Sequence, residues 1–263
     1  MDLGAMLLSQ AGGFALVFSR IAGFVATSPF PGNHASKTQR VGLVCVLSWV
    51  ATPLASFARV PSGPNGGLGA MLVASAMLEI GCGVAIGLTF RFVLAAADVA
   101  GAALAQASGL SSANVLDPTS GIQEPVLGRI LTLMSMLLAL SVGAHRIVIS
   151  YLLESLRVLP VGTHIDLAGA MPVFVLMASN ALLVGVRLSL PIVAVSLVLQ
   201  LTLAMIARAA PSLQIFSVGL ALLVLTTLTI LVEGIHEISA GMLVELASIG
   251  PHLDQVLSRL AGQ

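Results

Sequence analysis

Charged side chains are scarce in this sequence. Aspartate, glutamate, lysine and arginine make up 8% of the 263 residues, while hydrophobic residues make up 57% and the mean hydropathy is +1.06. Soluble globular chains contain about 25% charged residues, so the scarcity excludes that class and predicts an integral membrane protein. The formal net charge is zero. Nucleic-acid binding needs a basic excess, so we expect no nucleic-acid partner.

Cysteines and catalytic constellations are scarce as well. Cys45 and Cys82 both lie in apolar runs, which argues against a disulfide framework or a thiolate metal site. The glycines of "GCGVAIG" lie inside an apolar run and lack nucleotide-binding spacing. Glu233 and His236 form half of a di-iron pattern whose second Glu-x-x-His is missing. Because no nucleophile–base arrangement is visible, we predict no enzyme activity and no cofactor.

Long apolar runs are what the sequence has in abundance. Several approach the ~20 residues that a helix needs to cross a bilayer, whereas others are shorter. The runs are 3–19, 41–58, 68–78, 99–116, 130–144, 167–186, 188–207 and 209–232. They predict an all-α membrane protein with six to eight helical segments, forming kinked hairpins in one domain over residues 1–263. Asp2 is acidic and Arg20 follows the first run, so no cleavable signal peptide is expected.

The segment 68–110 is too long for one straight span, and small residues recur along it at helical spacing. Gly83 and Gly87 share one i, i+4 row, while Gly101 and Gly109 belong to a second row. Small residues at this spacing allow membrane helices to approach closely. We therefore expect tight helical neighbours, either within the chain or from other subunits.

Charges also interrupt the apolar segments. At bilayer depth a charge costs at least ~2.5–3.5 kcal/mol on insertion scales, and such residues usually face a bundle interior or a water-filled path. We predict buried charges at Glu79, Arg91, Asp98 and Arg187. They could pair structurally or act as an ion relay in a transporter; the acids are few and scattered, which favours pairing.

The tail from Glu233 onward alternates charged residues with leucine and isoleucine. This is the pattern of an amphipathic helix. Such a tail would lie on a partner or at the membrane interface, and a frayed end is the alternative.

A polar stretch, "GLSSANVLDPTSGIQEPVLGR" at 109–129, separates two apolar segments. Pro118 and Pro125 restrict its backbone, and Asp117 can hydrogen-bond its own turn. Gly109 and Gly121 permit backbone angles that other residues avoid. The pattern is typical of a compact loop, which is either a working element or a plain connection.

This stretch, with "HRIVISYLLESLRVLP" and "VRLSLPIVAVSLVLQLTLAMIARAAPSLQIFSVG" after it, resembles the family of bacterial flagellar biosynthetic proteins FliR. That family, with its injectisome relatives, belongs to the type III secretion export apparatus. The resemblance covers nearly the whole chain, including "SRIAGFVATSPFPG" near the start. The chain departs from the family pattern at Ser212 and Gln214, where Gln and Asn are expected, and after Gly143, where His-His is expected.

The resemblance implies a pore or gate subunit rather than a carrier. Members of the family assemble with FliP and FliQ, beside FlhB and other export components, into a channel for unfolded flagellar proteins. This places the chain among membrane lipid in the bacterial inner membrane, within the flagellar basal body. It also implies a FliP-like part at about 1–181, a FliQ-like hairpin at about 182–232 and the tail at 233–263. An injectisome gate subunit and an ion- or solute-coupled transporter are the alternatives.

Residue roles follow from the resemblance and from the glycine spacing. The polar stretch would plug the closed pore through Gly109, Leu110, Ser111, Ser112, Asn114, Asp117, Pro118, Thr119 and Gly121. We expect helix packing or assembly to depend on Gly83, Gly87, Gly101, Pro191, Arg208, Pro211 and Phe216.

Overall fold

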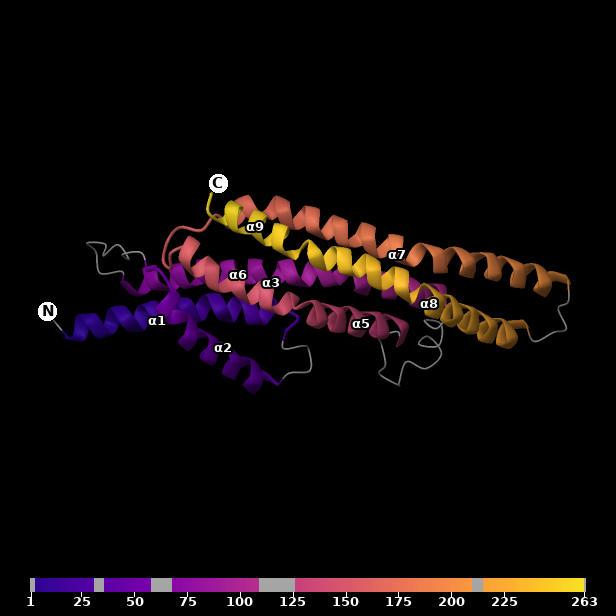
Figure 1. Cartoon of the computed structure of the whole chain (residues 1–263), viewed down its shortest axis with the longest axis horizontal. Helices are drawn as coiled ribbons and strands as arrows, with labels where there is room; N and C mark the ends of the chain where they lie inside the picture. The colour runs from indigo at the N-terminus through magenta and orange to yellow at the C-terminus, as the bar shows by residue number, and fades with distance from the viewer. Residues whose placement is uncertain (1–2, 31–35, 58–67, 109–125, 210–214, 263) are drawn as a thin grey trace. The chain divides into compact units, whose positions relative to one another are not determined.

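The computed structural model describes residues 3–30, 36–57, 68–108, 126–209 and 215–262 (Figure 1). Its helices are α1 (Leu3–Thr27), α2 (Lys37–Ala51), the short 3-10 helix η1 (Thr52–Leu54), α3 (Leu68–Ala107), α5 (Val126–Val142), α6 (Ala144–Val158), α7 (Leu167–Ala209), α8 (Ile215–Ala247) and α9 (Ile249–Leu260). Within these ranges the only β pairing is an isolated bridge between Phe57 and Val161. The predicted all-α fold is confirmed.

Local sequence signals set several helix ends. The Ser36 hydroxyl accepts from the Gln39 amide at 3.3 Å while the Gln39 side chain accepts from the Ser36 amide at 3.0 Å, a capping box that starts α2. Asp166 caps α7 by accepting from the Gly169 amide at 3.0 Å. Gly143 lies between α5 and α6 with φ of +78°, a conformation that favours glycine.

Length and composition make three of the described helical stretches able to cross a membrane. They cover residues 72–107, 167–209 and 221–260, and the α5–α6 pair would be a fourth if it forms one broken span. The sequence pattern placed 167–186 and 188–207 in separate runs, but α7 continues through Arg187 and Pro191. Arginine is a good helix former, so it interrupts the hydrophobicity of the run without ending the helix.

Two compact units make up the chain. Unit 1 comprises Met1–Phe92, Gly143–Met177 and Ser248–Gln263, and unit 2 comprises Val93–Val142 and Ala178–Ala247. In unit 1, α1 packs against α2, and α9 packs against α6. The apolar face of α9 is buried there, with Ile249, Leu253 and Val256 fully enclosed.

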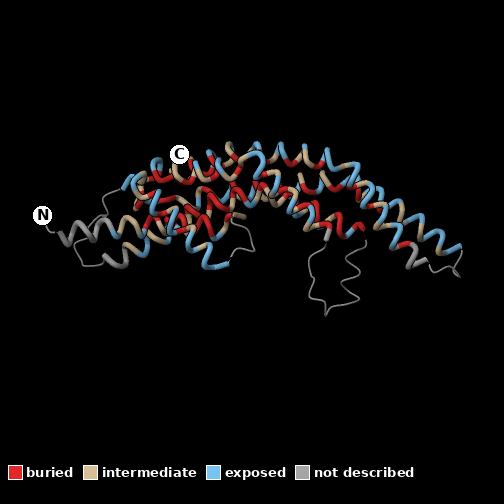
Figure 2. Tube along the Cα trace, turned by 60° about the horizontal axis from the view of Figure 1, so that its bottom comes forward, coloured by how far each residue is buried: buried red, intermediate tan, exposed pale blue. Residues whose placement is uncertain are grey.

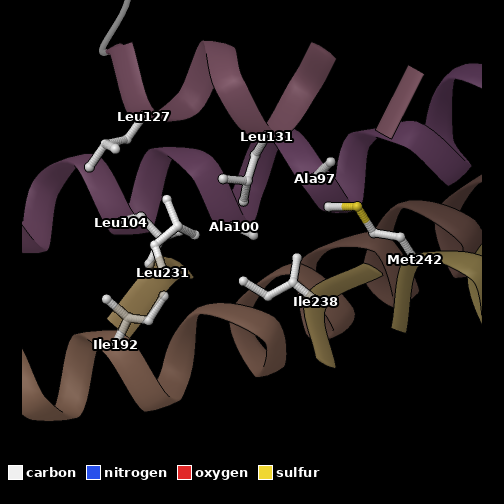
Figure 3. Close-up of a cluster of buried hydrophobic side chains, with 9 residues drawn as sticks. All are labelled: Ala97, Ala100, Leu104, Leu127, Leu131, Ile192, Leu231, Ile238 and Met242. Atoms are coloured by element: carbon white, nitrogen blue, oxygen red, sulfur yellow. The ribbon is translucent and has the colours of Figure 1, made fainter. Parts of the chain in front are cut away.

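Unit 2 has its own apolar core. Side chains from the second half of α3, from α5, from α7 and from α8 converge in it (Figure 3). The core residues are Ala97, Ala100, Leu104, Leu127, Leu131, Ile192, Leu231, Ile238 and Met242. In a membrane protein, van der Waals packing of such side chains holds the helices together, because lipid removes the hydrophobic driving force between them.

Candidate functional site

A fully buried ion pair lies in unit 1. The Arg20 Nε on α1 donates to the Glu79 Oε2 on α3 at 2.6 Å, and the exposed fractions of the two side chains are 0% and 1%. Both residues lie within otherwise apolar helical stretches. The close contact lets each charge compensate the other where water does not reach.

The remaining polar atoms of the pair bind the end of α6 and the turn that follows it. The Arg20 guanidinium donates to the carbonyl oxygens of Ser155 at 2.7 Å and Leu159 at 3.1 Å. The second Glu79 oxygen accepts from the Gly162 amide at 2.9 Å. Helix ends leave carbonyls without partners inside the helix, and a cation is favoured there. The pair therefore joins α1, α3 and α6 into one polar node.

Glycines allow α1 and α3 to cross at backbone contact beside this node. A Cβ at Gly83 would overlap the Arg20 carbonyl oxygen and lie 2.8 Å from the Phe24 nitrogen. A Cβ at Gly87 would overlap the Thr27 hydroxyl, and one at Gly23 would overlap the Ile80 carbonyl oxygen. The crossing has glycine on both helices, so close packing at Gly83 and Gly87 occurs within the chain. Their role in assembly with partner chains stays a prediction.

A second close crossing lies in unit 2, between α3 and α5. A Cβ at Gly101 would lie 2.6 Å from the Gly128 Cα. One turn away, the Thr132 hydroxyl donates to the Asp98 carboxylate at 2.5 Å. The structure therefore gives Asp98 a hydrogen bond with Thr132 and not an ion pair with Arg91.

Among the charges predicted to be buried, the chain itself buries Glu79. Arg91, Asp98 and Arg187 are exposed on the described chain. Arg91 and Asp98 share an outward face of α3, because the exposed positions 91, 98, 102 and 106 recur at helical spacing. Burial of these three charges by partner chains stays a prediction.

Other predicted residues have simple placements. Pro191 and Arg208 are exposed on α7, and Phe216 belongs to the first turn of α8. Pro211 lies outside the described residues. So does the whole predicted plug, from Gly109 to Gly121.

Sequence reasoning missed Arg20 as a partner for Glu79. The signal was present, because Arg20 is the only charged residue within α1, and Glu79 is the only charged residue of α3 before Arg91. Within the described ranges no group of three or more His, Cys, Asp or Glu side chains is placed to hold a metal ion. The expectation of no cofactor stays a prediction.

Comparison with known proteins identifies the family. The model of the bacterial export proteins, family 1, matches residues 11–247. The chain belongs to this family. A flagellar biosynthetic protein FliR from Bacillus subtilis (strain 168) is 29% identical over 223 residues, which cover 83% of this chain and 84% of the relative. The FliR of Escherichia coli (strain K12) is 29% identical over 77% of this chain and 76% of its own. That of Aquifex aeolicus (strain VF5) is 30% identical over 86% of each.

Family membership confirms the resemblance seen in the sequence. The chain is a component of the flagellar export apparatus, as its relatives indicate, and its long apolar helices are those of a membrane protein. In this chain the buried node of Arg20 and Glu79 positions α1, α3 and the end of α6. Both carboxylate oxygens of Glu79 already have partners, so the node holds helices in place.

Gly101→Ala is expected to weaken unit 2 measurably. The new methyl group would press on the α5 backbone at Gly128, and overpacking typically costs ~1–3 kcal/mol. Gly234 is the matched control, because it is a mid-helix glycine of the same unit and a Cβ there meets nothing within 4 Å. Gly234→Ala should be neutral or slightly stabilising through helix propensity. Unfolding of the solubilised protein in SDS measures both, and equal midpoints would contradict the close crossing.

Proposed function

We propose that the chain is a pore or gate subunit of the bacterial flagellar protein export apparatus. It assembles with FliP and FliQ, next to FlhB, into a channel through which unfolded flagellar proteins leave the cell. The channel lies in the inner membrane within the flagellar basal body. The observation that supports this best is the match of the bacterial export family over residues 11–247, together with relatives that are flagellar biosynthetic proteins FliR.

Uncovered apolar surface supports an assembly role. In the most apolar window of α7, 22% of the residues are buried by the rest of the chain, and in the most apolar window of residues 221–260 the share is 17%. Large side chains such as Met77 of α3 and Leu137 of α5 are also more than half exposed. Exposed apolar patches of this extent mark interaction surfaces.

The described charges do not favour a transporter. A relay requires ionisable groups along a shared path, but Glu79 is engaged by Arg20 and Gly162, and Asp98 binds Thr132. The relatives found are flagellar, which favours the flagellar system over an injectisome.

Co-purification tests the proposed assembly. We expect an affinity-tagged chain, solubilised gently from a flagellated host, to retain several partner chains that include FliP and FliQ. A tagged chain produced alone should be poorly folded, because its large exposed apolar side chains have no partner chain to cover them. A monodisperse, stable monomer that binds no export component would contradict the proposal.

Deletion of Ser111–Asn114 tests the predicted plug. The deletion should leave α3 and α5 in place, because α3 ends at Ala107 and α5 begins at Val126. We expect the assembled complex to leak small ions or solutes, with export retained. Membrane conductance of cells with the deletion is the measurement, alongside a check that the complex forms. A tightly sealed, assembled complex would show that the stretch is an ordinary connection.

A further inference from the structure

The short helix α2 lies at the edge of unit 1, beside α1 (Figure 1). The positions that it buries recur at helical spacing and are Val44, Ser48 and Ala51. Its 15 residues make a helix about 22 Å long, which is shorter than the ~30 Å hydrocarbon core of a bilayer. It does not belong to the described stretches that are able to cross a membrane. Its length therefore does not imply contact with lipid.

The side of α2 that faces away from α1 is apolar, and the chain leaves it uncovered (Figure 2). The exposed apolar side chains of α2 are Val41, Cys45, Val46, Trp49 and Val50. Trp49 is 77% exposed, the highest value among the described large hydrophobic side chains. An uncovered apolar face of this kind marks a surface that contacts something else.

The charges next to this face are all positive. The sequence has no aspartate or glutamate between Asp2 and Glu79, whereas Lys37 and Arg40 belong to the first turn of α2. Cations at the start of a helix oppose the helix dipole, so these two side chains do not stabilise α2 itself. They place positive charge beside the apolar face, which makes this surface complementary to one that is both apolar and anionic.

Polar groups at both ends of α2 have partners within the chain. The capping box of Ser36 and Gln39 satisfies amides at its start. Near its end, the Ser48 hydroxyl donates to the Val44 carbonyl at 2.6 Å, and the Thr52 hydroxyl donates to the Ser48 carbonyl at 2.7 Å. Polar groups that are satisfied internally allow a helix to lie where water is scarce.

We propose that α2 is an interfacial helix that lies along the surface of an anionic lipid leaflet. Its apolar side contacts the upper acyl segments, and Lys37 and Arg40 lie beside lipid phosphates. Such a leaflet presents negative headgroups directly next to apolar chains, as the cations and the apolar face of α2 require. Trp49 fits the same level, because tryptophan is enriched where headgroups meet hydrocarbon.

This surface is separate from the uncovered side chains of α3, α5, α7 and residues 221–260 that support the proposed assembly. The inference goes beyond the proposed pore function and does not depend on it.

The fluorescence of Trp49 tests the position of α2, because this is the single tryptophan of the chain. The full chain, with any partner chains that co-purify, is reconstituted into vesicles of phosphatidylcholine and phosphatidylglycerol. The lipids carry bromine either near the headgroup end or near the methyl end of their acyl chains. The same preparation of Trp49→Phe gives the emission of other chains, which is subtracted.

We expect bromine near the headgroup end to quench Trp49 more strongly than bromine near the methyl end. Stronger quenching from the methyl end would show that α2 is inserted deeply, and would overturn the interfacial position. No quenching from either end would show that water or a partner chain covers the face, and would overturn the contact with lipid.

Brominating one lipid class at a time tests the role of the cations. In equal mixtures, brominated phosphatidylglycerol should quench Trp49 about two- to fivefold more than brominated phosphatidylcholine, because cations at the membrane surface attract anionic lipid. Lys37→Gln should weaken this preference, and Lys37→Gln/Arg40→Gln should abolish it. Arg91→Gln on α3 is the matched control for loss of an arginine and should retain the preference. Equal quenching by both lipids in the native chain, or a full preference in the double variant, would overturn the role of the cations.

Retention of FliP and FliQ is scored separately on the same preparations. Failure of the proposed function and failure of this inference are therefore distinguishable.

Discussion

Arg20→Leu is expected to destabilise the protein by about 3–5 kcal/mol, the range for removing one partner of a buried ion pair. The substitution leaves the Glu79 carboxylate buried without its cation. It also leaves the carbonyl oxygens of Ser155 and Leu159 without the guanidinium that they bind. Buried polar groups without partners are costly. The expected result is a large loss of folded protein extracted from membranes and an unfolding midpoint at lower SDS concentration.

The double variant Arg20→Leu/Glu79→Leu separates the charge effect from the packing effect. Removing both charges should cost less than the sum of the single substitutions, because no unpaired charge remains. It should not restore full stability, since the amide of Gly162 and the carbonyl of Leu159 lose the partners that the ion pair supplied. Arg91→Leu on α3 is the control for loss of an exposed arginine. If Arg20→Leu and Arg91→Leu had the same effect, the buried node would not be a source of stability.

The sequence predicted that Glu79 is buried but did not predict its partner. Burial of a charge can be inferred from the residues around it, whereas its pairing with a distant residue cannot. Glu79 stands alone in an apolar, glycine-rich segment, so the cost of placing it in lipid predicts its burial. Its partner, Arg20, is 59 residues away in sequence. A cation at many other sequence separations could have paired with Glu79 equally well. The spacing of Arg91 and Asp98 correctly predicts a shared helix face, but Asp98 binds Thr132 on α5. Only the packing of α3 against α5 decides that choice.

The lengths of the apolar runs predicted where most helices lie. The residues at which the helices begin and end depend on local backbone conformation, which these runs do not show. The long segment predicted at 68–110 is α3, which ends at Ala107. The predicted run 130–144 ends next to the break at Gly143, which has a positive φ, but no apolar run predicted α6 (Ala144–Val158). The amphipathic tail was predicted from Glu233, yet α8 continues to Ala247 and the strongly amphipathic helix is α9. Pro251 in the first turn of α9 is compatible with a new helix start there.

Gly83→Ala is expected to have an effect comparable to loss of the ion pair. The added methyl group would meet backbone atoms of α1 at Arg20 and Phe24, and backbone cannot rotate away as a flexible side chain can. The helices would have to separate, which costs at least the ~1–3 kcal/mol typical of overpacking. Separation would also pull Arg20 away from Glu79, which lies one turn before Gly83 on α3.

Gly42→Ala is the matched control for this substitution. Gly42 belongs to α2 of the same unit, is exposed, and has nothing within 4 Å of an added Cβ. Alanine there should be neutral or stabilising by up to about 1 kcal/mol, because glycine is a poor helix former. Both variants are unfolded in SDS, once in the native sequence and once in the Arg20→Leu/Glu79→Leu background. The difference between the two backgrounds gives the energetic coupling between the glycine and the ion pair. Gly83→Ala should be milder in that background, because part of its effect is the loss of the ion pair. A full, unchanged penalty would show that the glycine crossing and the buried node are energetically independent.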